Sequence, residues 1–144
     1  MIEFIPGSST SAAALNAERV RLEIIAQNIA NANTTRGPNG LPYQRQEVVF
    51  ETVLGQQQSG SGVNAQPLAV RIARIQADPQ PPRLVYNPGH PDANAQGMVA
   101  LPNINIHAEM ADLIASSRTY EANLAAIKTA RTMADQTLSI GKHV

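Results

Sequence analysis

The chain has 144 residues, of which 43% are hydrophobic but only 3% are aromatic, so a large compact core is not expected. Eleven basic and eleven acidic side chains balance, and the basic ones are scattered, which argues against a nucleic-acid or anionic-lipid binding surface. The absence of cysteine excludes disulfides, thiolate metal sites and cysteine nucleophiles. Nine of the ten prolines and seven of the nine glycines lie between Gly37 and Pro102, which predicts helical ends around a non-helical middle.

The first element is predicted to be a helix from about Ser11 to Ala32. It is preceded by a short, flexible lead, Met1 to Ser9, in which Pro6 and Gly7 break any earlier helix. Its apolar side chains repeat at helical spacing and form one seam, which consists of Leu15, Leu22, Ile25 and Ile29. No apolar run reaches the roughly 18 residues of a membrane span, and the N-terminus lacks the pattern of a cleaved signal peptide.

An asparagine-rich stretch follows this helix, with Asn28, Asn31 and Asn33 ahead of Thr34. Asparagine is costly inside a helix but favourable at its end, where it hydrogen-bonds free backbone groups and accepts left-handed backbone angles. The stretch therefore predicts a C-terminal cap, and a polar contact surface is the alternative.

The middle of the chain, residues 37–102, is predicted to be a small β-rich insert. Strands are expected at Tyr43–Leu54, around Leu68–Ala73 and at Arg83–Tyr86, and Gly55–Gly62 is expected to be a flexible loop. The segment Asn87–Pro91 must turn because it holds two prolines and a glycine.

The last third, Asn105–Gly141, predicts one long helix with Asn105 or Asn103 as its N-cap. A second seam runs along it at alternating three- and four-residue steps, through Met110, Leu113, Tyr120, Leu124, Ile127, Ala134 and Leu138. The two terminal helices are predicted to pair as a coiled coil, in either direction. Because the shorter helix cannot cover the longer one, the remaining apolar surface predicts assembly with other copies or other proteins.

Catalytic patterns are weak in this chain. His107 and Glu109 resemble half of a zinc-deaminase motif, but the cysteine ligands of that site are missing. His90 and Asp92 lie in a proline-rich turn, where local stabilisation is the better interpretation. The sequence predicts no enzyme, no metal and no cofactor; a metal-dependent hydrolase and a membrane-surface amphipathic module are the alternatives in other classes.

Three stretches carry a family resemblance. Arg19–Leu22 with Ile25–Thr34 resembles the N-terminal motif of the flagellar axial proteins, the family of rod, hook and filament-junction subunits. Two later stretches are similar to its proximal-rod members: the first runs from Asp78 to Met110, and the second from Ser116 to Gly141. The positions that carry the motifs most visibly are Asn28, Asn31, Asn33, Thr34, Asn87, Pro88, Gly89, His90, Pro91, Asn103 and Asn105.

This resemblance implies an α+β protein in which residues 1–36 and 103–144 form an inner helical domain and residues 37–102 form the outer insert. It implies a structural subunit of the flagellar basal body, stacked helically into a hollow rod that crosses the periplasm and transmits torque to the hook. The implied partners are copies of itself, other proximal and distal rod proteins, the surrounding ring proteins and the flagellar type III export apparatus. Export would occur without a cleaved signal, and neither nucleic acid nor membrane insertion is expected.

Overall fold

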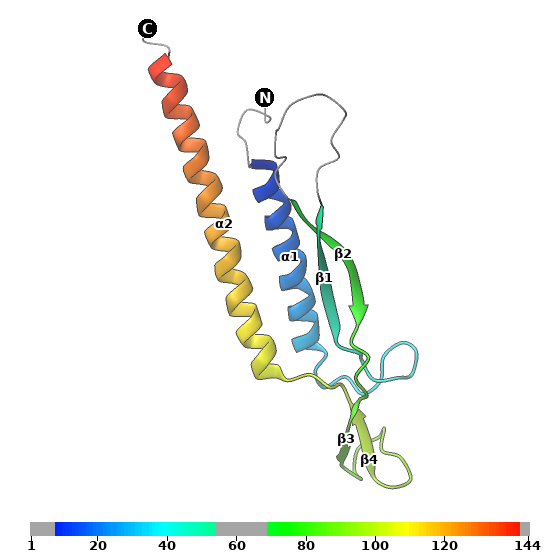
Figure 1. The fold of residues 1–144 in the computed structure, drawn as a ribbon. Helices are drawn as coiled ribbons and strands as arrows, with labels where there is room; N and C mark the ends of the chain where they lie inside the picture. Colours follow the sequence, from blue (N-terminus) through cyan, green and yellow to red (C-terminus); the bar gives the residue numbers. More distant parts are fainter. Residues whose placement is uncertain (1–7, 54–68, 142–144) are drawn as a thin grey trace.

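The computed structural model describes residues 8–53 and 69–141, so the predicted lead and the predicted loop at Gly55–Gly62 lie outside the described residues. Two helices and four strands follow one another along the chain (Figure 1). In order they are α1 (Ser8–Ala30), β1 (Gln46–Val53), β2 (Ala69–Ala77), β3 (Arg83–Tyr86), β4 (Met98–Leu101) and α2 (Ile106–Gly141). The architecture is α+β, as the distribution of helix breakers predicted.

The two helices lie side by side and run in opposite directions, which decides the orientation that the sequence left open (Figure 1). Helix α1 contacts α2 and also contacts both β1 and β2, so it forms the middle of three layers. Within the described residues, α2 has no comparable contact with either strand. One helix therefore fills most of the interior, and α2 keeps one side open to solvent.

The core is small and sits around α1. Its buried apolar side chains are Ala17, Ile24, Ile25, Ala32, Val99 and Ile104. Three polar side chains are buried as completely as these: Asn28, Glu109 and Ser116, each 2% exposed or less. A thin core that contains polar groups agrees with the low aromatic content.

The sheets are two antiparallel pairs, β1 with β2 and β3 with β4. The register of the first pair shifts between Val49 and Phe50, because Val49 lies opposite Arg74 whereas Phe50 lies opposite Ile72. This bulge explains the imperfect alternation of apolar residues in β1. The predicted first strand starts later than expected, at Gln46, and the second continues to Ala77.

The β3–β4 pair forms a separate hairpin that projects beyond the helices (Figure 1). The sequence predicted β3 correctly but missed β4, a strand of four residues. Gly97 precedes β4 with a φ of 75°, a conformation that glycine adopts without steric cost. An added Cβ at Gly97 would lie 2.9 Å from Cε2 of Tyr86, so the tight packing of this turn also requires glycine.

The side of α2 that faces inward differs from the apolar seam that the sequence predicted, because it also contains polar residues. The buried and half-buried positions follow three- and four-residue steps through Glu109, Leu113, Ser116, Tyr120, Asn123, Ile127, Ala130 and Ala134. Four of the seven expected seam positions lie on this inward side: Leu113, Tyr120, Ile127 and Ala134. Met110 and Leu124 point away from it and are 51% and 37% exposed. Leu138 continues the inward side near the end of α2 but is 61% exposed in the single chain.

Candidate functional site

The buried side chain of Asn28 links α1 to the start of β1. The side-chain amide of Asn28 donates to the backbone carbonyl of Gln46 at 2.9 Å and accepts from the backbone N–H of Gln46 at 2.9 Å. Asn28 thus pairs with the first residue of β1 as a neighbouring peptide would. Its Nδ2 also donates to Oε2 of Glu109 at 3.1 Å, and its Oδ1 accepts from the hydroxyl of Tyr43 at 3.1 Å. Both donors and both acceptor positions of the amide are therefore used.

The carboxylate of Glu109 is the second centre of this cluster. Arg45 donates from Nε to Oε1 of Glu109 at 2.7 Å, so each carboxylate oxygen has a partner. The same guanidinium contacts Glu47 at 2.6 Å and Asp78 at 3.6 Å. We call Asn28, Tyr43, Arg45, Gln46 and Glu109 the polar clamp, because together they join α1, the segment before β1, and α2.

The polar clamp shifts the ionisation of two of its members. Burial, reinforced by the negative charge of Glu109, raises the pKa of Tyr43 above its ordinary value of 10.0. Burial alone would lower the pKa of Arg45, but the hydrogen bond and charge of Glu109, followed by those of Glu47, outweigh it and raise the pKa. At neutral pH Tyr43 is therefore a neutral donor and Arg45 a fixed positive charge.

Helix α2 begins in a way that orients Glu109. Oδ1 of Asn105 accepts from the backbone N–H groups of His107 and Ala108 at 3.1 and 3.3 Å, so Asn105 is the N-cap that the sequence predicted as one of two choices. Glu109 follows in the first turn, where the positive end of the helix dipole favours a carboxylate. His107 is exposed and does not take part in the clamp.

The asparagine-rich stretch divides into different roles. Asn31 donates from its side chain to the carbonyl of Gln27 at 2.9 Å and accepts from Thr34 at 3.1 Å, so Asn31 caps the end of α1. Asn33 is exposed, whereas Asn28 is a buried contact residue. Asn31 therefore has the predicted capping role, whereas Asn28 lies inside α1 and forms buried hydrogen bonds within the chain. The left-handed backbone angles do not occur, because every described residue with positive φ is a glycine.

Asp92, directly after the turn at Asn87–Pro91, contacts the segment that follows α1. Oδ2 of Asp92 accepts from the hydroxyl of Thr35 at 2.8 Å, and Arg36 lies 3.7 Å from the same carboxylate. His90 supports this turn locally, since its Nδ1 accepts from the backbone N–H of Asp92 at 3.1 Å. Pro88, Gly89 and Pro91 are exposed, and Asn87 donates from its backbone to Gly97 at 2.8 Å.

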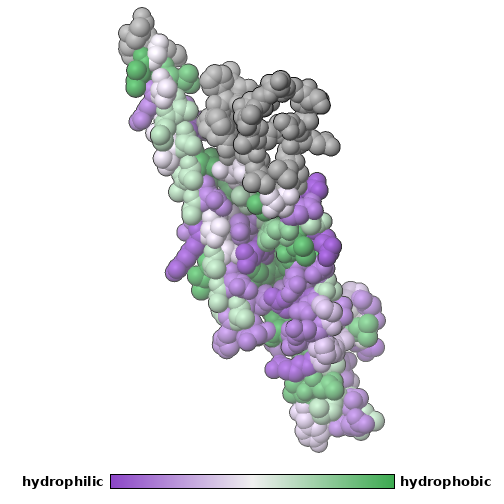
Figure 2. Space-filling view, in the orientation of Figure 1, coloured by the Kyte–Doolittle hydropathy of each residue, from purple (hydrophilic) through white to green (hydrophobic). Residues whose placement is uncertain are grey.

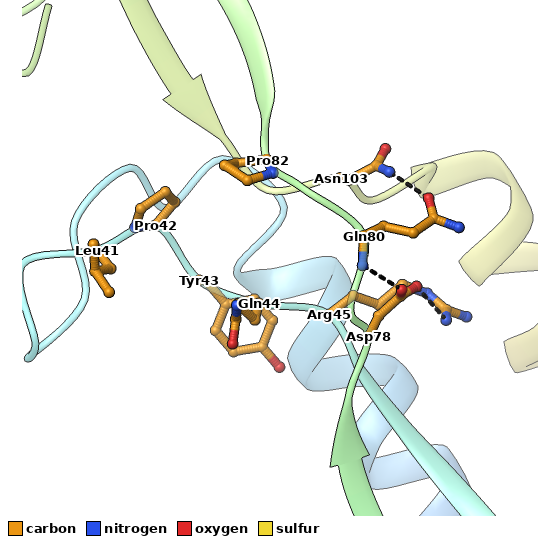
Figure 3. Close-up of a pocket in the computed structure, with 9 residues that line it drawn as sticks. All are labelled: Leu41, Pro42, Tyr43, Gln44, Arg45, Asp78, Gln80, Pro82 and Asn103. Atoms are coloured by element: carbon orange, nitrogen blue, oxygen red, sulfur yellow. Dashed lines mark hydrogen bonds and ion pairs between the residues drawn. The ribbon is translucent and has the colours of Figure 1, made fainter. Parts of the chain in front are cut away.

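A shallow depression of about 140 Å³ lies between the polar clamp and the hairpin (Figure 3). Tyr43 and Arg45 line it from one side, and Asp78, Gln80 and Pro82 line it from the other (Figure 3). Asn103 donates to Oε1 of Gln80 at 2.6 Å and thereby ties the two connections to the hairpin together. These contacts brace the base of the hairpin and provide no arrangement of nucleophile and base.

The predicted packing residues of α1 lie on the sides that face its neighbours. Ile25 is 6% exposed, and Leu15, Leu22 and Ile29 are half-buried. On a flank of α2, roughly 110° around the helix from its inward side, three apolar side chains form an exposed row at four-residue spacing. They are Ile106, Met110 and Ile114, with exposures of 38%, 51% and 56%. We call these three residues the outer row. Hydrophilic residues cover the middle of the molecule, while mostly pale, weakly hydrophobic residues line much of α2 (Figure 2).

Sequence reasoning missed Tyr43, Arg45 and Gln46 as site residues. Arg45 lies 64 positions from Glu109, and no local pattern relates the two. The one available signal was compositional: a tyrosine and an arginine lie at the start of the predicted strand Tyr43–Leu54, ahead of its apolar residues. Glu109 itself was singled out only with His107, as half of a zinc-deaminase motif whose cysteine ligands are missing.

Comparison with known proteins finds family matches at both ends of the chain. Residues 9–38 match the family model described as "Flagella basal body rod protein", and residues 95–140 match "Flagellar basal body rod FlgEFG protein C-terminal". These matches cover α1 with its asparagine-rich end, and β4 with nearly all of α2. Both ends of the chain are thus similar to proteins of the flagellar basal-body rod class.

Relatives that match nearly the whole chain show to which family within this class it belongs. The chain is 42% identical over 145 aligned residues to the flagellar basal-body rod protein FlgC of Bacillus subtilis, covering 93% of this chain and 95% of that protein. It is 40% identical to FlgC of Yersinia enterocolitica and 38% identical to FlgC of Escherichia coli, in each case over 90% of this chain and 91% of the relative. The chain belongs to the FlgC family of flagellar basal-body rod proteins. No described helix has the length and hydropathy needed to cross a membrane.

Proposed function

We propose that this chain, as a structural flagellar rod subunit, assembles helically into the hollow shaft that crosses the periplasm and transmits torque to the hook. The observation that supports this most directly is its identity to FlgC proteins over about nine-tenths of the chain. Copies of the chain and other proximal and distal rod proteins are its partners in this proposal. Ring proteins would surround it, and the flagellar type III apparatus would export it without cleaving a signal.

The exposed apolar residues of α2 support assembly. A single chain leaves the outer row exposed to solvent, on a flank of α2 beside the face that contacts α1. Burial of one such side chain contributes roughly 1.5–3 kcal/mol, so a neighbour that covers all three would stabilise the assembled form substantially. We propose that neighbouring subunits pack against the outer row, and that the paired terminal helices complete a coiled-coil inner wall.

The domain division follows from the same proposal. Residues 1–36 and 103–144 would form the inner tube, and residues 37–102 would form its outer part. The polar clamp joins these parts inside one subunit, since Asn28 and Glu109 come from the helices while Tyr43 and Arg45 come from the insert. Torque applied to one part would thereby pass to the other through fully paired hydrogen bonds rather than through a mobile linker.

The experiment is deletion of the gene in a motile host followed by complementation. The deletion strain should lose swimming and should yield basal bodies that lack a complete rod. The unchanged gene should restore both. A deletion strain that still swims would refute the proposal.

A further inference from the structure

A groove of about 340 Å³ lies between β1 and the start of α2, with α1 as its floor. Ile24 and Ile25 of α1 form the apolar part of this floor, and both are 6% exposed. Val48 and Phe50 line the β1 wall, where Phe50 is 37% exposed. We call this depression the side groove. Its apolar wall is open to solvent in the single chain.

The polar side chains of the side groove do not need a new partner. Asn28 and Glu109 line it, but their hydrogen bonds are already made within the polar clamp. Three other charged side chains, Arg21, Glu47 and Asp112, are half-buried and so reach water. An apolar centre inside a polar rim is typical of protein–protein interfaces. The side groove can therefore receive apolar side chains without leaving a buried polar group unpaired.

The side groove and the outer row lie on opposite flanks of α2. Asp112 lines the side groove, and Met110 is the middle residue of the outer row. Because these residues are two positions apart on a helix, their side chains point about 160° away from each other. The sheet, α1 and α2 form three layers, and each flank crosses the side of this stack (Figure 1). One chain therefore cannot bring its own outer row to its own side groove.

The two surfaces have similar lengths. The outer row covers residues 106–114 of α2, which span about 12 Å. The β1 wall of the side groove covers residues 46–50, or about 13 Å, and its floor covers residues 21–28 of α1, or about 11 Å. A helix flank that carries three apolar side chains thus has the length needed to lie along the groove.

The symmetry of the assembly favours this contact. A contact of one outer row with another would be isologous and would close as a dimer. A contact between two different surfaces is heterologous, and it repeats from copy to copy to build a ring or a helix. The helical assembly in the proposed function requires the second kind, so the inference rests on that proposed function.

We propose that the side groove of one subunit receives the outer row of a neighbouring copy of the same chain. Met110 of one copy then packs against Val48 and Phe50 of the next. Each subunit uses one flank for the neighbour on one side and the other flank for the neighbour on the other side. The same contact therefore continues along the assembly.

Disulfide cross-linking in assembled rods tests this contact, because the sequence has no cysteine. The complemented deletion strain carries Met110→Cys/Val48→Cys, with one cysteine at the middle of each surface. The control pair Met110→Cys/Val49→Cys changes the adjacent valine, whose side chain points to the other face of the sheet. After oxidation of isolated basal bodies, the first pair should give covalent dimers and longer chains, roughly fivefold more than the control, because only its cysteines face each other.

Two outcomes would overturn the contact. Equal cross-linking by the two pairs in strains that swim would show that the outer row does not lie in the side groove, while the rod function would stand. Equally abundant dimers from Met110→Cys alone would show that one outer row contacts another. A deletion strain that swims without complementation would instead refute the proposed function itself.

A charge pair gives a second measurement that does not depend on cysteines. Met110→Glu and Phe50→Lys should each slow swimming roughly fivefold or more, because each places an unpaired charge in the contact. The double variant should recover most of this loss, since the two charges meet between neighbouring copies. Met110→Glu/Val49→Lys is the control and should not recover. Absence of recovery in the first double variant would overturn the proposal.

Discussion

The side-chain amide of Asn28 donates a hydrogen bond to the carboxylate of Glu109 at 3.1 Å, across 81 positions of sequence. Asn28 lies near the end of α1, and Glu109 lies in the first turn of α2. Both side chains are 2% exposed or less. Since an unpaired buried polar group is costly, each of these residues makes the other necessary, and the pair fixes which ends of the two helices meet.

Replacement of Asn28 should therefore lower the free energy of unfolding far more than replacement of Asn33, an exposed asparagine five positions further along the chain. Asn28→Ala removes four hydrogen bonds and leaves buried partners unpaired, so we expect a loss of about 3 kcal/mol in the free energy of unfolding. Asn33→Ala, at an exposed asparagine of the same stretch, should change it by less than about 0.5 kcal/mol. Urea denaturation with unchanged m-values measures both, and equal losses would contradict the assigned role.

Arg45 and Glu109 should be energetically coupled. Arg45→Met leaves a buried carboxylate without its positive partner, and we expect a loss of about 2–3 kcal/mol, reduced from the fully buried case because Arg45 is 25% exposed. The double variant Arg45→Met/Glu109→Gln should recover part of this loss. A double-mutant cycle should give a coupling energy of about 1–3 kcal/mol, and additive effects would refute the coupling.

Alkaline pH should destabilise the protein through Tyr43. Because the pKa of Tyr43 is raised in the folded state, the unfolded chain loses this proton first as the pH rises past about 10. The stabilisation is thus complete below pH 10 and is lost as the pH rises through the folded-state pKa. Tyr43→Phe should remove this part of the pH dependence and cost about 1 kcal/mol at pH 7 for the lost hydrogen bond to Asn28.

Tyr86→Phe is the control for that measurement. The ring of Tyr86 is 70% exposed on the hairpin, so its replacement should leave the alkaline loss due to Tyr43 in place. Urea unfolding from pH 8 to pH 11 distinguishes the two variants. Identical pH profiles for Tyr43→Phe and the unchanged protein would contradict the burial of Tyr43.

Gly97 should be required for both its backbone angle and its close packing. Gly97→Ala places a Cβ at a φ of 75°, 2.9 Å from Tyr86 and 3.2 Å from Pro88. Gly40→Ala meets the same backbone condition, a φ of 74°, with no atom within 4 Å of its Cβ. We expect Gly40→Ala to lower the free energy of unfolding by about 1–2 kcal/mol, and Gly97→Ala to lower it by more. Amide exchange at β3 and β4 locates the effect, and equal costs would show that packing at Gly97 is unimportant.

The outer row should matter for assembly and not for folding of the subunit. Ile114→Asp alters a side chain that is 56% exposed, so the free energy of unfolding should change by less than about 0.5 kcal/mol. In the complemented deletion strain, however, a buried charge in the rod should abolish swimming. Glu121→Ala, at an exposed polar position of the same helix, should swim normally. Normal swimming by Ile114→Asp would exclude the outer row from the subunit contacts.

The sequence predicted elements whose causes are local. A long stretch without glycine or proline favours a helix by near-neighbour hydrogen bonds alone, and both helices occur close to the expected residues. The cap at Asn105, the strand at Arg83–Tyr86 and the turn after it likewise depend on a few adjacent residues. The short strand β4 was missed because four residues carry too little periodicity to stand out.

The inward side of α2 shows why apolar counting alone was insufficient. The sequence seam selected Met110 and Leu124, but the structure turns Glu109 and Asn123 inward beside Leu113 and Tyr120. A search that considers only apolar residues cannot identify a buried carboxylate such as that of Glu109. Glu109 can be buried only because Asn28 and Arg45 supply its hydrogen bonds from other parts of the chain.

The sequence by itself therefore determined the helical ends, the β-rich middle and, through its motifs, the family of this protein. Only the tertiary structure decided that α1 and α2 run antiparallel, which asparagine is buried and which is a cap, and which side of α2 faces inward. The physical reason is range: local elements depend on residues a few positions apart. The polar clamp, in contrast, depends on hydrogen-bond partners 64 and 81 positions apart, which only the packing of the folded chain brings together.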